Sequence, residues 1–372
     1  MKKTFLFILI GIFIFTSVAF FNGCSKKDDV IKIGAILPLS GDAAIYGKWA
    51  KQGLELAVNE LNNNTNQKKK IKIIYEDDQC GPQAGVNSYH KLVNVDKVKV
   101  IIGALCSSST MAIEPLANKD KVLLFSPGSS SPLLSNSGPY FFRNWPSDIY
   151  EGEFMAEFMY KDQGITNAAI LYINNDYGLG LKNVFEEKYK SLGGEIILIE
   201  MFNQDDSSFR EQLLKIKNRN VQGLYVPGHT KELGKIRKQM KELDIVIPFF
   251  SVVGFESPNT LEIAGNTAEG VFYTAPYFDT DSDIKNSQDF VSNYLKEYGE
   301  KPENFAAHAY DAVKILVQII NDVGIDTDKM IEALLELDYQ GVSGPTEFKD
   351  NGDVIQPAMI KTVKDGKFVK YE

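Results

Sequence analysis

Short β-branched runs alternate with longer amphipathic segments along most of the chain. The run VIKIGAIL at 30–37 has the length and the Val/Ile content of a buried strand, whereas 46–61 repeats apolar residues at helical spacing. The first part of the chain is expected to form strands at 30–37, 71–75, 98–102 and 122–125, with helices at 46–61, 83–93 and 110–118. Strands separated by helices predict right-handed crossovers and a mainly parallel sheet.

The same alternation starts again after Pro146. Strands are expected at 168–173, 195–201, 223–226, 248–252 and 270–273. The helices between them cover 149–161 and 178–191, a third opened by a capping box at Ser208 and Glu211, and a fourth that ends near 243. Three helices follow at 284–298, 306–322 and 328–337, and the tail from Gly341 carries the turn signals of short strands.

Two similar α/β units therefore follow one another, and the remaining segment does not form a third. A chain of this length favours two cores. In the simplest arrangement the last helices pack against the first unit. The chain then passes between the two units near 143–147, 274–278 and 348–353, and these three connections make a hinge. We expect lobe 1 to comprise 30–145 plus 276–348, and lobe 2 to comprise 146–275 plus 349–372.

The N-terminal segment has the pattern of an export signal. Lys2 and Lys3 precede an apolar run at 5–21, and Asn22-Gly23-Cys24 follows. A cysteine after a small residue resembles the lipobox of bacterial lipoproteins, so we expect a signal peptide at 1–23 and a tether at 24–29 lipidated at Cys24. An uncleaved membrane anchor is the alternative, because the run is near spanning length. Both interpretations place the folded part outside the cytoplasm, on the periplasmic or cell-surface side of a membrane.

Composition narrows the classes of function. The formal net charge is -9 and no dense basic block is present, which argues against a nucleic-acid partner. No Cys or His cluster has ligand spacing, and no G-x-S-x-G or H-E-x-x-H sequence occurs, so we expect no metal, no cofactor and no enzyme. Besides Cys24, only Cys80 and Cys106 remain. An oxidising compartment favours a disulfide between them, with two reduced thiols as the alternative.

Two hydroxyl-rich loops follow predicted strands, at the edge where ligands of open α/β sheets bind. GALCSSST at 103–110 leads into a helix, whose free N–H groups and dipole favour an anion. SPGSSSP at 126–132 belongs to the same lobe. A helix cap would explain one hydroxyl residue of the first segment but not four in a row. A flexible polar loop would explain the second segment alone, but both segments at one sheet edge predict a carboxylate site.

Two loops of the second unit are weaker candidates. NNDYGLG at 174–180 resembles a dinucleotide fingerprint, but Asn183 stands in place of the third glycine. We instead expect Tyr177 to cover a ligand from the second lobe. His229 follows another strand and is a further candidate, although a lone histidine is more often an ordinary loop residue.

Several motifs, taken in order, resemble those of the branched-chain amino acid binding proteins of ABC transporters. They are ILPLSG at 36–41, YG at 46–47, DDxC at 77–80, CSSST at 106–110, SP at 126–127, DYG at 176–178 and EGV at 269–271. The resemblance runs from about residue 31 to the end. It implies a type I periplasmic binding protein fold, α/β, with two lobes of mainly parallel sheet flanked by helices and a three-segment hinge. It also implies a monomer that passes a small amino acid to ABC permease subunits.

The resemblance further implies that Cys80 and Cys106 are paired and that Ser107 binds the ligand carboxylate. Together with the loops it selects the candidate ligand-binding residues, which are Tyr46, Ser107, Ser108, Gly128, Ser129, Ser130, Tyr177, His229, Val253 and Glu256.

One departure from the family pattern concerns the ligand's amino group. The family places an acidic residue for the ammonium group in a segment like Gly-x-Asp-Gly-Trp, and Val253 stands there in SVVGFE at 251–256. Glu256 is a substitute if the loop bends differently. Otherwise the ligand lacks an amino group, as an aromatic or keto acid, an amide or urea would. A ligand sensor of the same fold is a further alternative, and a secreted hydrolase lacks any catalytic motif.

Overall fold

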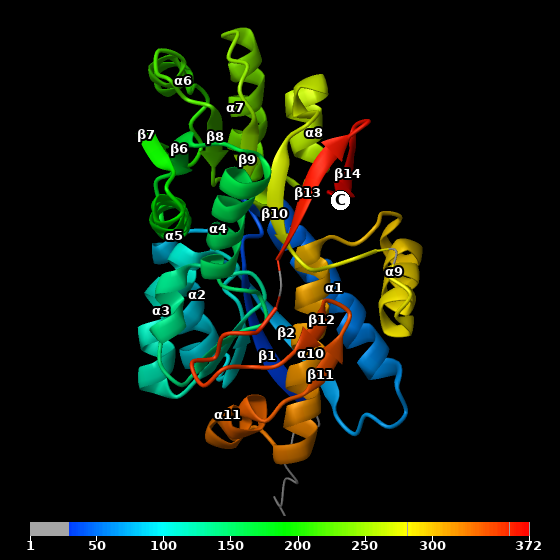
Figure 1. Cartoon of the computed structure of the whole chain (residues 1–372). Coiled ribbons are helices and arrows are strands. Elements are labelled where there is room, and N and C mark those ends of the chain that lie inside the picture. Colours follow the sequence, from blue (N-terminus) through cyan, green and yellow to red (C-terminus); the bar gives the residue numbers. More distant parts are fainter. Residues whose placement is uncertain (1–29, 281, 357, 372) are drawn as a thin grey trace, which may run out of the picture.

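The computed structural model describes residues 30–280, 282–356 and 358–371. The expected signal peptide at 1–23, the tether at 24–29 and the lipidation of Cys24 lie outside the described residues. Two α/β lobes stand one above the other in Figure 1, and three segments of the chain connect them.

A five-stranded parallel sheet forms the centre of lobe 1. Its order is β2-β1-β3-β4-β5, with β1 (Val30–Leu37), β2 (Lys70–Asp77), β3 (Val100–Ile102), β4 (Leu123–Ser126) and β5 (Phe141–Arg143). Ile33 and Leu37 face the core under one set of helices, and Ile36 faces the other core. Burial of both faces explains why these strands read as continuous apolar runs.

The helices of lobe 1 cover both faces of its sheet (Figure 1). One core contains residues of α1 (Ala44–Asn63), α9 (Lys285–Tyr298), α10 (Asn304–Val323) and α11 (Thr327–Leu335). The opposite core contains residues of α2 (Pro82–His90) and α3 (Ser107–Asp120). The late helices α9 to α11 thus pack with the first unit, and a small antiparallel pair, β11 (Tyr339–Gly341) and β12 (Gly344–Thr346), follows them.

Lobe 2 is built on a seven-stranded sheet of order β14-β13-β10-β9-β8-β6-β7. Its parallel strands are β6 (Asn167–Ile173), β7 (Glu195–Phe202), β8 (Gly223–Val226), β9 (Phe249–Ser251) and β10 (Phe272–Pro276). The C-terminal hairpin, β13 (Ala358–Lys364) and β14 (Lys367–Lys370), joins β10 in antiparallel register. Its helices are α4 (Asp148–Glu157), α5 (Asp176–Ser191), α6 (Arg210–Lys217), α7 (Thr230–Glu242) and α8 (Pro258–Ala264).

The three crossings lie between β5 and α4, after β10, and before β13. The third was expected near 348–353, and Asp353 pairs there with Arg143, at the end of β5, in an isolated parallel bridge. The position of this pairing depends on a long-range contact that no local pattern predicts.

Two local predictions were wrong. Strand β5 was not expected, because three residues between turns carry too little periodic signal. The capping box at Ser208 does not form: α6 begins at Arg210 with Phe209 at its N-cap and no side-chain cap. Phe209 is fully buried, and its N–H donates to Gln239 Oε1 at 2.8 Å. Burial of the ring determines where this helix begins.

No helix within the part of the chain that the structure describes is long and apolar enough to span a membrane.

Candidate functional site

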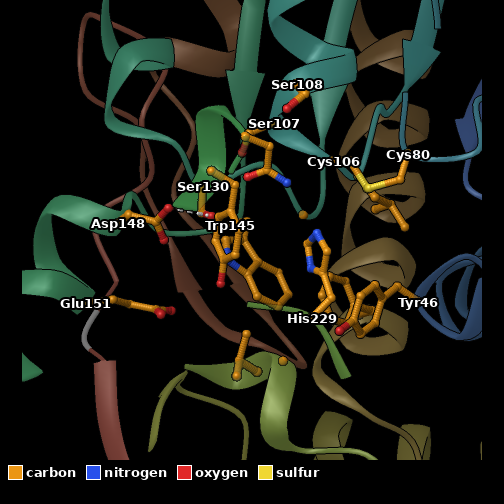
Figure 2. Close-up of a pocket in the computed structure, with 17 residues that line it drawn as sticks. Tyr46, Cys80, Cys106, Ser107, Ser108, Ser130, Trp145, Asp148, Glu151 and His229 are labelled. Atoms are coloured by element: carbon orange, nitrogen blue, oxygen red, sulfur yellow. Dashed lines mark hydrogen bonds between the residues drawn. A yellow bond between two sulfur atoms is a disulfide. The ribbon is translucent and has the colours of Figure 1, made fainter. Parts of the chain in front are cut away.

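A small cavity of about 50 Å³ lies between the lobes, beside the start of α3 (Figure 2). Eight of the expected ligand-binding residues line it, and two, Ser129 and Glu256, do not. The lining residues that were expected are Tyr46, Ser107, Ser108, Gly128, Ser130, Tyr177, His229 and Val253. The remaining ones are Cys80, Leu105, Cys106, Trp145, Asp148, Glu151, Asn175, Gly254 and Phe305.

The N-terminus of α3 supplies hydrogen-bond donors to the cavity. Ser107 is the first residue of this helix, follows the carboxyl end of β3 and is buried. Its Oγ accepts a hydrogen bond of 3.1 Å from the N–H of Ser131, which ties the two hydroxyl-rich loops together. The first N–H groups of a helix have no partner within it. Ser107 and Ser108 therefore present main-chain N–H groups, in addition to hydroxyls, to an anion.

The hydroxyl group of Ser129 is occupied within lobe 1. It donates to the carbonyl of Ala104 at 2.9 Å and lies 2.6 Å from Thr110 Oγ1. Ser126 Oγ donates to the same carbonyl at 2.6 Å. Ser129, which we expected to contact the ligand, instead holds the second loop against the first.

The side chain of Arg143 holds the backbone of the second hydroxyl-rich loop in place through hydrogen bonds. Its side chain is fully buried, and its Nη1 donates to the carbonyls of Ser129 at 3.2 Å and Ser131 at 2.9 Å. Its Nε donates to Asp353 Oδ1 at 2.6 Å. Because the guanidinium group is committed to these partners and does not line the cavity, it positions the loop and is not a group for the ligand.

Two buried carboxylates, Asp148 and Glu151, line the cavity from the first turn of α4. Ser130 Oγ donates to Asp148 Oδ2 at 2.9 Å, and Thr274 Oγ1 donates to Glu151 Oε2 at 3.3 Å. Asp148 Oδ1 and Glu151 Oε1 have no hydrogen-bond partner among the described residues. Sequence reasoning missed both acids, since acidic residues in a first helical turn are ordinary dipole partners.

Burial makes ionisation of these acids unfavourable. It raises the pKa of Glu151 to about 7. The pKa of Asp148 is raised well above its usual range by burial and by the nearby charge of Glu151. No Lys or Arg occurs among the described residues that line the cavity. A positively charged group of a ligand would supply the missing partner, because a buried carboxylate is costly without one.

Aromatic rings form the other walls of the cavity. Tyr177 stacks on His229 with ring centroids 5.6 Å apart and an interplanar angle of 6°. Phe305 stacks on Tyr46 at 4.8 Å and on Trp145 at 4.5 Å. Burial lowers the pKa of His229 to about 4, so its imidazole is neutral at pH 7. In Figure 2, Asp148 and Glu151 lie along one side of the site, and Tyr46 and His229 along the other.

The structure has the closed arrangement of the lobes. Tyr46 of α1 and Thr230 at the start of α7 are joined by a 2.7 Å hydroxyl–hydroxyl contact and by the N–H of Thr230, which donates to Tyr46 Oη at 2.9 Å. Asp42 of lobe 1 forms an ion pair with Lys231 of lobe 2. These contacts cross the cleft and enclose the cavity.

The segment at 251–256 offers no carboxylate to the cavity. Val253 lines the cavity and contributes apolar surface. Glu256 lies outside it, forms an ion pair with Lys361 and lines a neighbouring groove with Glu303. The loop does not bend in the way that would bring Glu256 to the ligand, and its carboxylate already has a cationic partner.

A disulfide joins Cys80 and Cys106, as expected. Their Cα atoms are 5.3 Å apart and their sequence separation is 26. The bond attaches the turn after β2 to the residue before Ser107. It therefore restrains the N-terminus of α3 where that helix meets the cavity.

Comparison with known proteins agrees with this architecture. A family model described as periplasmic binding protein matches residues 30–367. The leucine-, isoleucine-, valine-, threonine-, and alanine-binding protein of Pseudomonas aeruginosa is 29% identical over 346 residues, which is 91% of each chain.

Solved structures show the same fold. The leucine binding protein of Thermotoga maritima superposes with a TM-score of 0.87 at 27% identity, covering 92% of this chain and 98% of that chain. The branched-chain amino acid transporter substrate binding protein of Streptococcus pneumoniae, in complex with isoleucine, gives 0.84 at 27% identity, covering 91% and 97%. The predicted two-lobed fold and the resemblance are confirmed. Family members are solute-binding proteins rather than enzymes, and this chain belongs to the periplasmic binding protein family.

Proposed function

We propose that this chain is the solute-binding protein of an ABC importer and that it holds a small neutral amino acid as a zwitterion. The observation that carries the proposal is the opposition of two kinds of group in one cavity. Hydroxyls and free N–H groups at Ser107 and Ser108 suit a carboxylate. The unpaired oxygens of Asp148 and Glu151 suit an ammonium group.

The closed cavity is small, at about 50 Å³ of space between its lining side chains, which favours a small solute. Alanine, serine, threonine and the branched-chain amino acids belong to this class. The relative from Pseudomonas aeruginosa is named for binding alanine and threonine as well as the branched-chain amino acids.

The two acids disfavour the alternatives that lack an amino group. An aromatic or keto acid would place its carboxylate in a cavity that already contains Asp148 and Glu151, with no cation to offset them. Each acid would then have to remain protonated. A zwitterion avoids this cost, because its ammonium group pairs with the acids and its carboxylate with α3.

The wider function follows from the family and the motifs. The chain acts outside the cytoplasm as a monomer, tethered through Cys24, and delivers its solute to permease subunits without making or breaking bonds. The closed form is the state that the permease selects, and the solute shifts the population toward it by binding this state more tightly.

A thermal-shift screen followed by calorimetry tests the solute class. Alanine, serine, threonine, leucine, propionate, pyruvate, benzoate and urea are compared on the full chain, because a tight solute stabilises in proportion to the logarithm of its concentration over its dissociation constant. Alanine is expected to bind much more tightly than propionate, which has the same carbon chain without the amino group. Equal affinities for alanine and propionate would refute recognition of a zwitterion.

A further inference from the structure

Three carboxylates from both lobes converge at the edge of the contact between the lobes, outside the solute cavity. Asp42 lies between β1 and α1 in lobe 1. Asp205 lies between β7 and α6, and Glu232 in the first turn of α7, both in lobe 2. One carboxylate oxygen from each residue lies within 4.8 Å of the others. No metal was expected here, because the prediction rested on the spacing of Cys and His, and these three carboxylates come from distant segments of the chain.

Glu232 is the residue that points to a ligand. It is only 1% exposed, and its Oε1 accepts a hydrogen bond of 2.9 Å from the N–H of Asp205. Its Oε2 has no hydrogen-bond partner in the described part of the chain. A buried carboxylate oxygen without a partner is costly to the fold, so its presence on a residue that clusters with two further carboxylates indicates a cation that they share.

The local charge has the sign that a divalent cation requires. Asp206 adds a further negative charge near Glu232. The positive charges that face the cluster are Lys231, which pairs with Asp42, and Lys235, whose Nζ lies 3.5 Å from the carbonyl of Asp206. Four acids against two lysines leave an excess of two negative charges. Lys231 is 42% exposed, so it can turn into solvent when a cation takes its place at Asp42.

We propose that Asp42, Asp205 and Glu232 form a binding site for a divalent cation that prefers oxygen ligands, and that this cation bridges the two lobes in the closed form. Carboxylates alone suit Ca²⁺ or Mg²⁺, whereas Zn²⁺ and Cu²⁺ favour sites that contain nitrogen or sulfur. Ca²⁺ is the better fit, because it tolerates irregular geometry and completes its shell with water.

The position of the site couples it to closure of the cleft. Asp42 lies on the segment that leads into Tyr46, and Glu232 lies in the helical turn that Thr230 begins. The cation therefore sits beside the hydrogen bonds that join Tyr46 to Thr230. An open form would separate Asp42 from the other two ligands. A cation that gains a ligand on closure shifts the population toward the closed form. Cation and solute then strengthen each other's binding, and thermodynamic linkage requires the two affinities to rise by the same factor.

Calorimetry and small-angle X-ray scattering on the full chain without solute test the proposal. CaCl₂ and MgCl₂ are titrated against NaCl of matched ionic strength. We expect Ca²⁺ to bind with a dissociation constant on the order of 0.1–1 mM, as in extracellular calcium modules, and to reduce the radius of gyration. Neither readout depends on the identity of the solute, so the outcome is separate from that of the proposed function.

Substitutions distinguish the site from general charge effects. Asp205→Asn is expected to weaken Ca²⁺ binding by at least about 10-fold, because it removes one of three charged ligands. Asp42→Asn is expected to leave weaker binding within lobe 2 but to abolish the compaction. Both acids are surface-accessible enough to be changed without loss of the fold, unlike Glu232. Glu262→Gln, which removes an exposed acid elsewhere in lobe 2, is the matched control and should behave as the unaltered protein.

Three results would overturn the proposal. The first is an absence of binding heat and of compaction with either cation up to about 10 mM, well above the range of extracellular sites. The second is a Ca²⁺ response that is the same in the Asp42→Asn and Asp205→Asn variants as in the unaltered chain. Compaction that persists in Asp42→Asn alone would refute the bridge between the lobes.

Discussion

The hydroxyl group of Tyr46 in lobe 1 bonds to both the side chain and the main chain of Thr230 in lobe 2, at 2.7 Å to Oγ1 and 2.9 Å to the nitrogen. Thr230 Oγ1 in turn donates to the carbonyl of Gly254 at 3.0 Å. This short chain of hydrogen bonds connects α1, α7 and the loop at Val253. It exists only when the cleft is closed, so it contributes to solute affinity and not to the stability of an open lobe.

Replacement of Tyr46 by Phe should therefore weaken solute binding. The variant keeps the ring that stacks on Phe305 but loses the hydroxyl and leaves the Thr230 N–H without its partner. The expected loss is about 1 kcal/mol, or roughly five- to tenfold in affinity. Calorimetry with alanine measures it. Tyr89→Phe is the control, since Tyr89 donates to Asp120 within lobe 1 and should leave affinity unchanged. Equal affinities in the two variants would contradict the role of Tyr46.

Ser107 and Ser129 should differ in their effect on solute binding. Ser107→Ala removes a hydroxyl that faces the cavity and accepts from the Ser131 N–H, so it is expected to weaken binding by roughly 1–3 kcal/mol and to cost some stability as well. Ser129→Ala removes hydrogen bonds to Ala104 and Thr110 and should lower the melting temperature instead. Affinity is measured by calorimetry and stability by thermal unfolding. The assignment fails if Ser107→Ala binds alanine as tightly as the unaltered protein does.

Glu151 should make the stability of the solute-free protein depend on pH. Its pKa is about 7 in the folded protein, above the ordinary value of 4.5 that applies to the unfolded chain. The folded state therefore holds the proton more tightly, and this stabilisation is fully present below about pH 4.5. It is lost as the pH rises through about 7. The free energy of unfolding should fall by up to about 3 kcal/mol over this range.

Glu151→Gln should reduce this pH dependence to the part that Asp148 contributes, and it should raise the melting temperature at pH 8, because the amide avoids burial of a charge. Urea unfolding at pH 5 and pH 8 measures the effect. The same variant should bind alanine more weakly, since it loses a partner for the ammonium group. If instead the substitution lowers stability at pH 8, then Glu151 is not a buried, unpaired acid.

Arg143 should be the most sensitive position outside the cavity. Arg143→Met leaves Asp353 buried without its cation and two carbonyls of the hydroxyl-rich loop without donors. We expect a loss of about 3–5 kcal/mol in the free energy of unfolding, the usual cost of breaking a buried pair. Lys48→Met breaks the exposed pair with Glu300, whose side chains are 50% and 41% exposed, and should cost less than about 1 kcal/mol. Urea unfolding of the two variants provides the comparison, and similar losses would contradict this role for Arg143.

The amino-acid sequence by itself determined the elements of the fold. Strand β1 could be predicted from its length and its Val and Ile content, and helix α1 from the spacing of its apolar residues, because both are local properties of the sequence. The hydroxyl-rich loops could be placed at one sheet edge, because strands in a parallel sheet share a carboxyl edge. Strand β5 was not predicted, because a run of three residues is too short to show a repeat of apolar side chains.

Only the tertiary structure decided which polar side chains face the cavity between the lobes. Ser129 and Ser130 are neighbours in the sequence, yet one hydroxyl is held inside lobe 1 and the other reaches Asp148 across the hinge. Glu256 pairs with Lys361, 105 positions away, and lies outside the cavity, which Asp148 and Glu151 of α4 line instead. The direction of a side chain and the pairing of a charge depend on long-range contacts, and such contacts leave no period in the sequence.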